Sequence, residues 1–186
     1  AIVYATFKIL GIDQMIVSDG ALREGLIQDL MGRIFDHDIR SSTVKNWADR
    51  FHTDKPHADR IKQTLAYMLP QLSSDKCPID NDTITQYLDW AADLHEIGRD
   101  IAHSGYHKHS AYIIENGDLA GFSRQDQILL ATIVRTHRRK FVRSLFAALP
   151  EPWNELAPYL SILLRLAVLL RRNRFESDLP DFKVSI

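Results

Sequence analysis

The stretch that decides the fold begins L-H-E-I-G at residues 94–98, continues H-S-G-Y-H-K-H-S at 103–110 and ends T-H-R-R-K at 136–140. It holds five of the eight histidines in the chain. His95 and Glu96 stand side by side where a pattern of helical period ends, so both side chains can reach one point. Imidazole and carboxylate groups are metal ligands, whereas clustered cations suit phosphate. The stretch therefore predicts a polar site between helices.

Outward from this stretch, apolar residues recur at helical spacing from about residue 41 onward, so the fold class is predicted to be mainly α. The helix starts are marked by capping residues or proline. The expected helices and their signals are residues 41–51 after Ser41-Ser42, a helix opening at Pro56, one capped by Asn81 or Asp82, residues 108–116, one capped by Ser123, and residues 153–172. Residues 12–30 instead predict a short strand, a turn and a helix, as at the end of an α/β layer.

The composition is that of an ordinary globular protein of 186 residues, with 45% hydrophobic and 25% charged residues. A net charge of -1 gives no global attraction to nucleic acid or membrane, yet residues 127–174 hold nine basic residues against two acidic ones. That local field suits a polyanion. Cys77 is the single cysteine, which excludes an internal disulfide and fits a cytoplasmic location. The apolar run at 159–170 is interrupted by Arg165, so no membrane span is predicted.

The histidine loop and the basic helix end together predict a phosphate-binding surface. A glycine loop followed by a helix start favours anions, and hydroxyl and cationic groups add donors. The candidate substrate-binding residues are His103, His107, Lys108, His109, Arg135, His137, Arg138, Arg139 and Lys140. The alternatives are a solvated loop and a basic helix end that the helix dipole favours whatever the function. No specific nucleic-acid partner is predicted, because the basic cluster has no interleaved aromatic residues.

A metal centre would draw on His57, His95 and Glu96, a pattern that resembles the His, His-Asp and distant Asp of HD phosphohydrolases. The distant position falls on Val168, which has no ligand atom, and Glu96 is one methylene longer than aspartate. Metal–ligand distances tolerate errors of only about 0.2 Å. We therefore predict degenerate HD positions at His57, His95, Glu96 and Val168, with no metal. An active HD-type metal-dependent phosphohydrolase is the alternative.

Several motifs resemble the C-terminal part of the exopolyphosphatase / guanosine pentaphosphate phosphohydrolase (Ppx/GppA) family. They are S-D-G-A-L-R-E-G at 18–25, A-A-D-L-H-E-I-G at 91–98, H-S-G-Y-H-K-H-S-A-Y-I-I at 103–114, D-L-A-G-F at 118–122, V-R-T-H-R-R-K at 134–140 and L-L-R-L-A-V-L-L at 163–170. The resemblance implies three parts: 1–33, the tail of a second actin-like α/β domain; 34–178, an HD-like helical bundle; and 179–186, the start of a further segment. Arg23 and Glu24 would lie at the interdomain cleft.

The resemblance also implies a function for the parent protein. Family members release terminal phosphates from inorganic polyphosphate or guanosine pentaphosphate with Mg²⁺, using residues of the actin-like domains. The chain is then expected to be a fragment with no cofactor and no catalytic residue of its own, inactive alone. It is expected to bind polyphosphate or guanosine pentaphosphate and to support a homodimer. A purely structural dimerisation module is a further alternative.

Overall fold

The computed structural model describes residues 8–9, 11, 37–72, 79–175 and 181–184. The chain divides into two compact units, residues 1–36 and residues 37–186. The expected strand, turn and helix of residues 12–30 lie outside the described residues, as do Arg23, Glu24 and Cys77. The helices from α3 onward, and every site residue described below, belong to the second unit.

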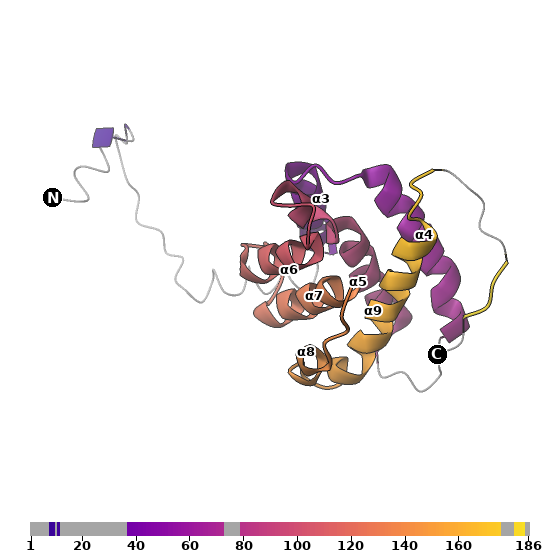
Figure 1. Ribbon diagram of the computed structural model, residues 1–186. Helices are drawn as coiled ribbons and strands as arrows, with labels where there is room; N and C mark the ends of the chain where they lie inside the picture. Colours follow the sequence, from indigo (N-terminus) through magenta and orange to yellow (C-terminus); the bar gives the residue numbers. More distant parts are fainter. Residues whose placement is uncertain (1–7, 10, 12–36, 73–78, 176–180, 185–186) are drawn as a thin grey trace. The chain divides into compact units, whose positions relative to one another are not determined.

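The described part of this unit is all-helical, with seven α-helices, one 3₁₀ turn and no strand, which confirms the mainly α prediction (Figure 1). In chain order these are α3 (His37–Arg50), α4 (Lys55–Leu72), α5 (Asn81–Leu94), η1 (Ile97–Asp100), α6 (Tyr106–Asn116), α7 (Arg124–Thr136), α8 (Arg143–Ala147) and α9 (Trp153–Leu170). The sequence pattern missed α8, because five residues are too few to show helical periodicity.

Side-chain caps mark the starts of α5 and α7. Asp80 caps α5 by accepting from the backbone N–H of Thr83 at 2.7 Å, so the predicted cap at Asn81 or Asp82 was wrong by one or two residues. Ser123 caps α7 as predicted, in a capping box with Asp126. The carboxylates of Asp80 and Asp126 also lie at the positive end of their helix dipoles, which stabilises each helix start.

The helix α3 corrects a second expectation. It begins at His37, so Ser41 and Ser42 lie inside it rather than capping it. Serine at a cap and serine on an exposed helical face cannot be told apart from residue type alone, and both of these serines are exposed.

The core lies where α4, α5, α7 and α9 meet, with α6 packed on α7. Figure 1 shows α9 alongside α4, and the two helices are in contact. Edge-on aromatic contacts join α5 to its neighbours: Trp90 lies 4.8 Å from Phe122 and Tyr87 lies 5.0 Å from Trp153, between ring centroids. Since such pairs favour one geometry over others, they help to fix where each helix ends relative to the next.

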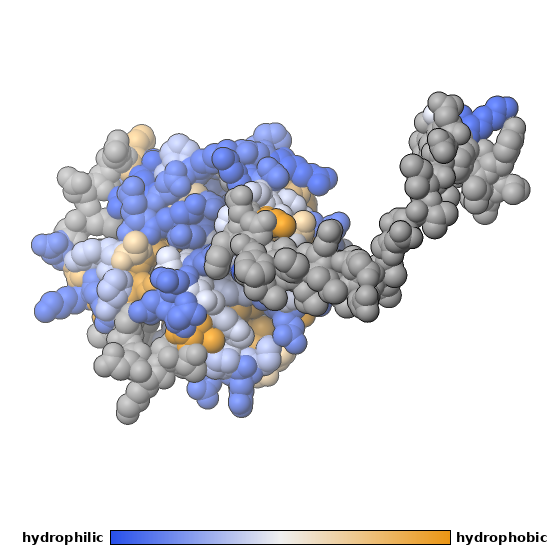
Figure 2. All heavy atoms as spheres, turned by 180° about the vertical axis from the view of Figure 1, so that it is seen from behind, coloured by the Kyte–Doolittle hydropathy of each residue, from blue (hydrophilic) through white to orange (hydrophobic). Residues whose placement is uncertain are grey.

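Among the described helices, α9 has the length and hydropathy of a membrane span, although its apolar run at 159–170 is too short by itself. Core helices of globular proteins share that property. Here Leu160, Leu164 and Ala167 are buried against neighbouring helices, and the outer face carries exposed Tyr159. Figure 2 shows a face on which hydrophilic side chains predominate and hydrophobic ones form small patches.

Residues 181–184 lie along α4. Phe182 packs against Tyr67 with ring centroids 5.1 Å apart, and the Val184 N–H donates to the Gln71 side-chain oxygen at 2.9 Å. This described piece of the final segment forms no strand.

Candidate functional site

A pocket of about 500 Å³ opens where η1, the start of α6, the end of α7 and the end of α9 come together. Its lining residues are His57, Glu96, Arg99, His103, Tyr106, His137, Arg138, Arg139, Arg165, Val168, Leu169, Arg172 and Arg174. Six of these are arginines and one is a carboxylate. The pocket therefore carries a large excess of positive charge, which suits an anionic ligand.

Arg165 forms part of the pocket wall. From α9 it donates to the carbonyl oxygens of His137, Thr136 and Arg139 at 3.0, 3.1 and 2.6 Å. These carbonyls come at and just beyond the end of α7, where helix carbonyls lack intrahelical partners. Arg165 thus holds in place the turn that carries Arg138 and Arg139.

Two arginines remain available for a ligand. The side chains of Arg139 and Arg172 make no hydrogen bond or ion pair with any described residue, and both are exposed. Arg139 has a left-handed backbone, with φ of 64°. Arg138, next to it, places its guanidinium 4.9 Å from the centre of the Tyr106 ring. A phosphate entering the pocket would find guanidinium donors whose charge is not already neutralised.

Four of the nine predicted phosphate contacts line the pocket: His103, His137, Arg138 and Arg139. His107 is buried close by, with its ring 6.3 Å from that of His137. The other predicted residues do not line it; these are Lys108, His109, Arg135 and Lys140. The helix α6 begins at Tyr106 rather than at Lys108, and Gly105 precedes it with φ of 71°.

Six pocket residues were not among the predicted site residues: Arg99, Tyr106, Arg165, Leu169, Arg172 and Arg174. The sequence carried a partial signal for three of them, since the last three arginines belong to the basic stretch 127–174. Arg99 directly follows L-H-E-I-G, and nothing in residue spacing sets it apart from an ordinary exposed arginine.

The potential metal ligands do come together. His57 in the first turn of α4, His95 at the end of α5 and Glu96 just before η1 have ligand atoms within 4.8 Å of one another, and all three are buried. Val168 lies on the pocket wall and supplies no ligand atom. The set therefore contains two imidazoles and one carboxylate, which is a donor set for a transition metal rather than for Mg²⁺.

Hydrogen bonds define the ring states of His95 and His137. Each places Nδ1 against the backbone carbonyl three residues earlier, Ala92 at 2.7 Å and Val134 at 2.5 Å. Since a carbonyl only accepts, Nδ1 carries the proton and Nε2 bears the lone pair. Both Nε2 atoms are buried without a hydrogen-bond partner among the described residues, and that of His95 lies 3.9 Å from Glu96 Oε1.

Burial keeps these imidazoles neutral. It lowers the pKa of His95 and that of His137, for which nearby charges add to the effect. The pKa of His57 falls to about 4 because of burial and the charge of Arg174. For His107, burial and the charges of Arg135 and Arg138 likewise lower the pKa to about 4. At neutral pH the positive charge of the pocket therefore comes from its arginines.

Glu96 is the one carboxylate in the pocket and is 7% exposed. Arg99 donates to its Oε1 at 2.9 Å and Arg174 donates to the same oxygen at 2.5 Å. Burial alone would raise its pKa, but His95 and these two guanidinium groups outweigh burial and lower it. Glu96 is therefore ionised and engaged by arginine.

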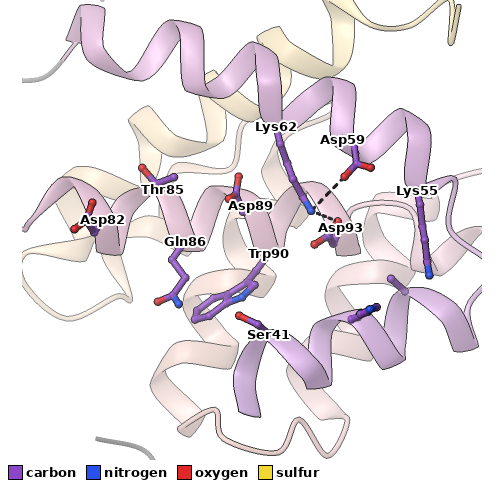
Figure 3. Close-up of a pocket in the computed structure, with 12 residues that line it drawn as sticks. Ser41, Lys55, Asp59, Lys62, Asp82, Thr85, Gln86, Asp89, Trp90 and Asp93 are labelled. Carbon is purple, nitrogen blue, oxygen red and sulfur yellow. Dashed lines mark ion pairs between the residues drawn. The ribbon is translucent and has the colours of Figure 1, made fainter. Parts of the chain in front are cut away.

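A second pocket, of about 580 Å³, lies between α3, α4 and α5 (Figure 3). Lys62 reaches Asp93 at 2.7 Å and Asp59 at 3.7 Å across it. Its remaining charged residues are Lys45, Lys55, Asp82 and Asp89. Four carboxylates against three lysines give no strong preference for either sign of ligand, so this pocket is the weaker candidate.

Comparisons with known proteins agree with the sequence motifs. The family model described as Ppx/GppA phosphatase, domain III matches residues 39–184. The whole chain is 33% identical to the guanosine-5'-triphosphate,3'-diphosphate pyrophosphatase of Pseudoalteromonas translucida (strain TAC 125), covering 37% of that protein. Over 98% of the chain it is 34% identical to the protein of that name from Aeromonas hydrophila, covering 36% of it. The chain thus spans little more than a third of the length of these relatives.

Proposed function

This chain belongs to the Ppx/GppA phosphatase family, as its domain III, and we propose that it binds the phosphate chain of inorganic polyphosphate or of guanosine pentaphosphate. The observation that carries the proposal is the pocket in which six arginines face one carboxylate. That carboxylate is already paired with Arg99 and Arg174, so the remaining arginines retain their charge for a ligand.

Guanidinium groups are suited to this task because each presents a planar fork of donors that matches two phosphate oxygens. Arg139 and Arg172 line the pocket from different segments, one after α7 and the other after α9. A phosphate chain lying between them would contact both. Arg138, and His103 in the loop before α6, would add further donors.

The proposal extends to the parent protein. The relatives are named as pyrophosphatases of guanosine-5'-triphosphate,3'-diphosphate, and we propose that the parent is a cytoplasmic hydrolase of phosphoanhydride bonds that uses Mg²⁺. Its catalytic residues would lie outside this chain. We also propose that the helical unit is HD-like, which the convergence of His57 with His95 and Glu96 supports.

Binding is tested by titrating the chain with inorganic tripolyphosphate and, separately, with guanosine pentaphosphate in a calorimeter. Replacing Arg139 and Arg172 together by alanine should weaken binding about tenfold, the effect of losing roughly 1.4 kcal/mol. Affinity should also fall as NaCl is raised, because salt screens exposed charges. The matched control is Arg124→Ala at the start of α7, outside the pocket.

The proposal fails if Arg124→Ala weakens binding as much as the pocket variant does, or if neither ligand binds at low salt. Assays for released phosphate should show no hydrolysis of either ligand by this chain. Hydrolysis that depends on His95 would instead favour the alternative of an HD-type metal-dependent phosphohydrolase.

Support of a homodimer is the second part of the proposal. The outer face of α9 carries Tyr159, exposed by 48%. Analytical ultracentrifugation of Tyr159→Glu should show loss of a dimer that the native chain forms, whereas Tyr112→Glu on α6 should leave it intact. If the native chain forms a dimer and the variant lacking Arg139 and Arg172 binds the anions as the native chain does, the alternative of a purely structural dimerisation module is favoured.

A further inference from the structure

We propose that a groove between α3 and α6, the aromatic groove, binds the guanine base of a nucleotide whose phosphates lie in the arginine pocket. The arginine pocket is the one lined by six arginines. The aromatic groove has a volume of about 490 Å³, and Trp47, Phe51, Tyr112, Asn116 and Asp118 line it. This assignment rests on the proposed function and chooses between its two ligands, because inorganic polyphosphate has no base.

Three aromatic side chains line the groove. Trp47 near the end of α3 and Phe51 just after that helix are half-buried, with their ring centroids 5.8 Å apart. Tyr112 on α6 is 68% exposed. Nucleobases stack on aromatic side chains, because every base has a flat π face. The groove therefore offers a planar base a surface on which to stack.

Gly117, directly after α6, allows the indole of Trp47 to lie against the end of that helix. A Cβ atom at this position would collide with the Trp47 ring. The indole therefore packs against the backbone at one end of the groove. A ring that is already held in place loses little freedom when a ligand stacks on it, so less of the interaction is offset by ordering.

Hydrogen-bond acceptors lie beside the rings. The side chain of Asp118 is exposed and makes no hydrogen bond or ion pair with any described residue. Asn116 donates from Nδ2 to the Tyr112 carbonyl at 2.9 Å, which leaves its Oδ1 to accept. Guanine presents a ring N–H and an exocyclic amine side by side, and an ionised carboxylate can accept from both. Adenine has an acceptor in place of that ring N–H, so the same carboxylate disfavours it.

A small third pocket, of about 310 Å³, connects the aromatic groove with the arginine pocket. It shares Phe51 with the groove, and it shares Glu96, Arg99 and Arg174 with the arginine pocket. The groove itself holds one arginine and one carboxylate, so its charge does not attract phosphate. A nucleotide has a base at one end and anionic groups at the other, which is the order of rings and arginines along this surface.

The test titrates guanosine triphosphate, adenosine triphosphate and inorganic tripolyphosphate into the native chain and its variants in a calorimeter. Tyr112→Ala should weaken binding of guanosine triphosphate about tenfold, the effect of losing one base–aromatic stack, and should leave tripolyphosphate binding unchanged. Asp118→Asn should weaken binding of guanosine triphosphate but not of adenosine triphosphate. The matched control is Tyr67→Ala, an exposed tyrosine on α4 outside both sites, which should bind all three ligands as native does.

Circular dichroism and thermal melting establish that each variant is folded; if Tyr112→Ala is not, Tyr112→Leu removes the aromatic ring while keeping an apolar side chain. Replacing Arg139 and Arg172 together by alanine should weaken binding of guanosine triphosphate as well as of tripolyphosphate. If guanosine triphosphate binding depends on Tyr112 but not on this arginine pair, the placement of base and phosphates of one molecule in the two sites is overturned.

Failure of the base site and failure of the proposed function give different results. If tripolyphosphate does not bind the native chain, the proposed function fails and the base site falls with it. If tripolyphosphate binds but a folded Tyr112 variant leaves guanosine triphosphate binding unchanged, or weakens both ligands equally, only the base site is overturned. Equal affinity of the native chain for guanosine and adenosine triphosphate overturns the choice of guanine.

Discussion

The guanidinium of Arg165 closes the end of α7 by donating from Nε to the carbonyl oxygen of His137 at 3.0 Å. Its Nη2 reaches two more carbonyls, those of Thr136 and Arg139. One side chain on α9 therefore satisfies three acceptors at and beyond a helix end, and fixes the turn that brings Arg138 and Arg139 into the pocket.

Replacing Arg165 by methionine should lower the free energy of unfolding by about 2 kcal/mol, because charge-assisted hydrogen bonds to partly buried carbonyls are lost. Urea denaturation measures the change. Arg143→Met, an exposed arginine at the start of α8, should stay within about 0.5 kcal/mol of native. Equal losses in the two variants would contradict the role given to Arg165.

Gly98 should not tolerate a larger residue. A Cβ atom there would lie 2.3 Å from the backbone nitrogen of Ser110 and 2.4 Å from the carbonyl oxygen of Tyr106. Since both atoms belong to the backbone of α6, Gly98→Ala must push α6 away from η1 and should cost about 3 kcal/mol or more.

The comparison for that variant is Gly105→Asn. Gly105 has a positive φ, but a Cβ atom there would make only an ordinary contact, 3.9 Å from the Lys108 side chain, and asparagine tolerates the left-handed region. Its cost should stay below about 1 kcal/mol. Thermal melting of both variants would show whether close approach or backbone conformation is the stricter requirement in this loop.

Asp126 should matter more than Ser123, although both belong to one capping box. Ser123→Ala should cost about 1 kcal/mol, the usual value for a lost cap. Asp126 also accepts from the hydroxyl of buried Tyr87 at 2.6 Å, so Asp126→Ala should cost roughly 1–3 kcal/mol more. Adding Tyr87→Phe should recover part of that loss, and additive costs in the double variant would disprove the coupling.

Stability should fall in mild acid, and His107 is one of the buried histidines responsible. Its pKa is about 4 in the folded chain against a usual 6.5. The unfolded chain therefore takes up the proton first, and stability present above pH 6.5 is lost as pH falls toward 4. His107 alone contributes a loss of about 1.4 kcal/mol for each pH unit in that window.

Urea denaturation at pH 7 and pH 5 tests this directly. Between pH 7 and pH 5, the free energy of unfolding of His107→Gln should fall by about 2 kcal/mol less than that of the native chain. Lys108→Gln, which leaves the imidazole in place, should keep most of the native slope. The same slope in His107→Gln as in native would assign the acid sensitivity to other groups.

The parts of the fold that were predicted from sequence have local causes. The α7 start follows from Ser123 and Asp126, three residues apart, and the α9 start at Trp153 follows from its apolar period. The errors were local as well: an Asp-Asn-Asp run holds three potential caps in succession, and only backbone conformation selects Asp80. The five-residue α8 gave no periodic signal.

The candidate site was predicted less completely. Residue types identified a cationic region, and His103, His137, Arg138 and Arg139 do meet in one pocket. Lys140 directly follows Arg139 in sequence yet does not line the pocket, because adjacent residues on a helix or turn point in different directions.

By itself, then, the sequence determined that this is a helical unit of the Ppx/GppA family, because helical period, caps and motif order act over short spans of chain. Tertiary structure decided which charged residues share a pocket and which of them pair with one another. Arg99 and Arg174 come from distant segments and meet at one oxygen of Glu96. The packing of α4, α5 and α9 places them there, and no pattern along the chain encodes that convergence directly.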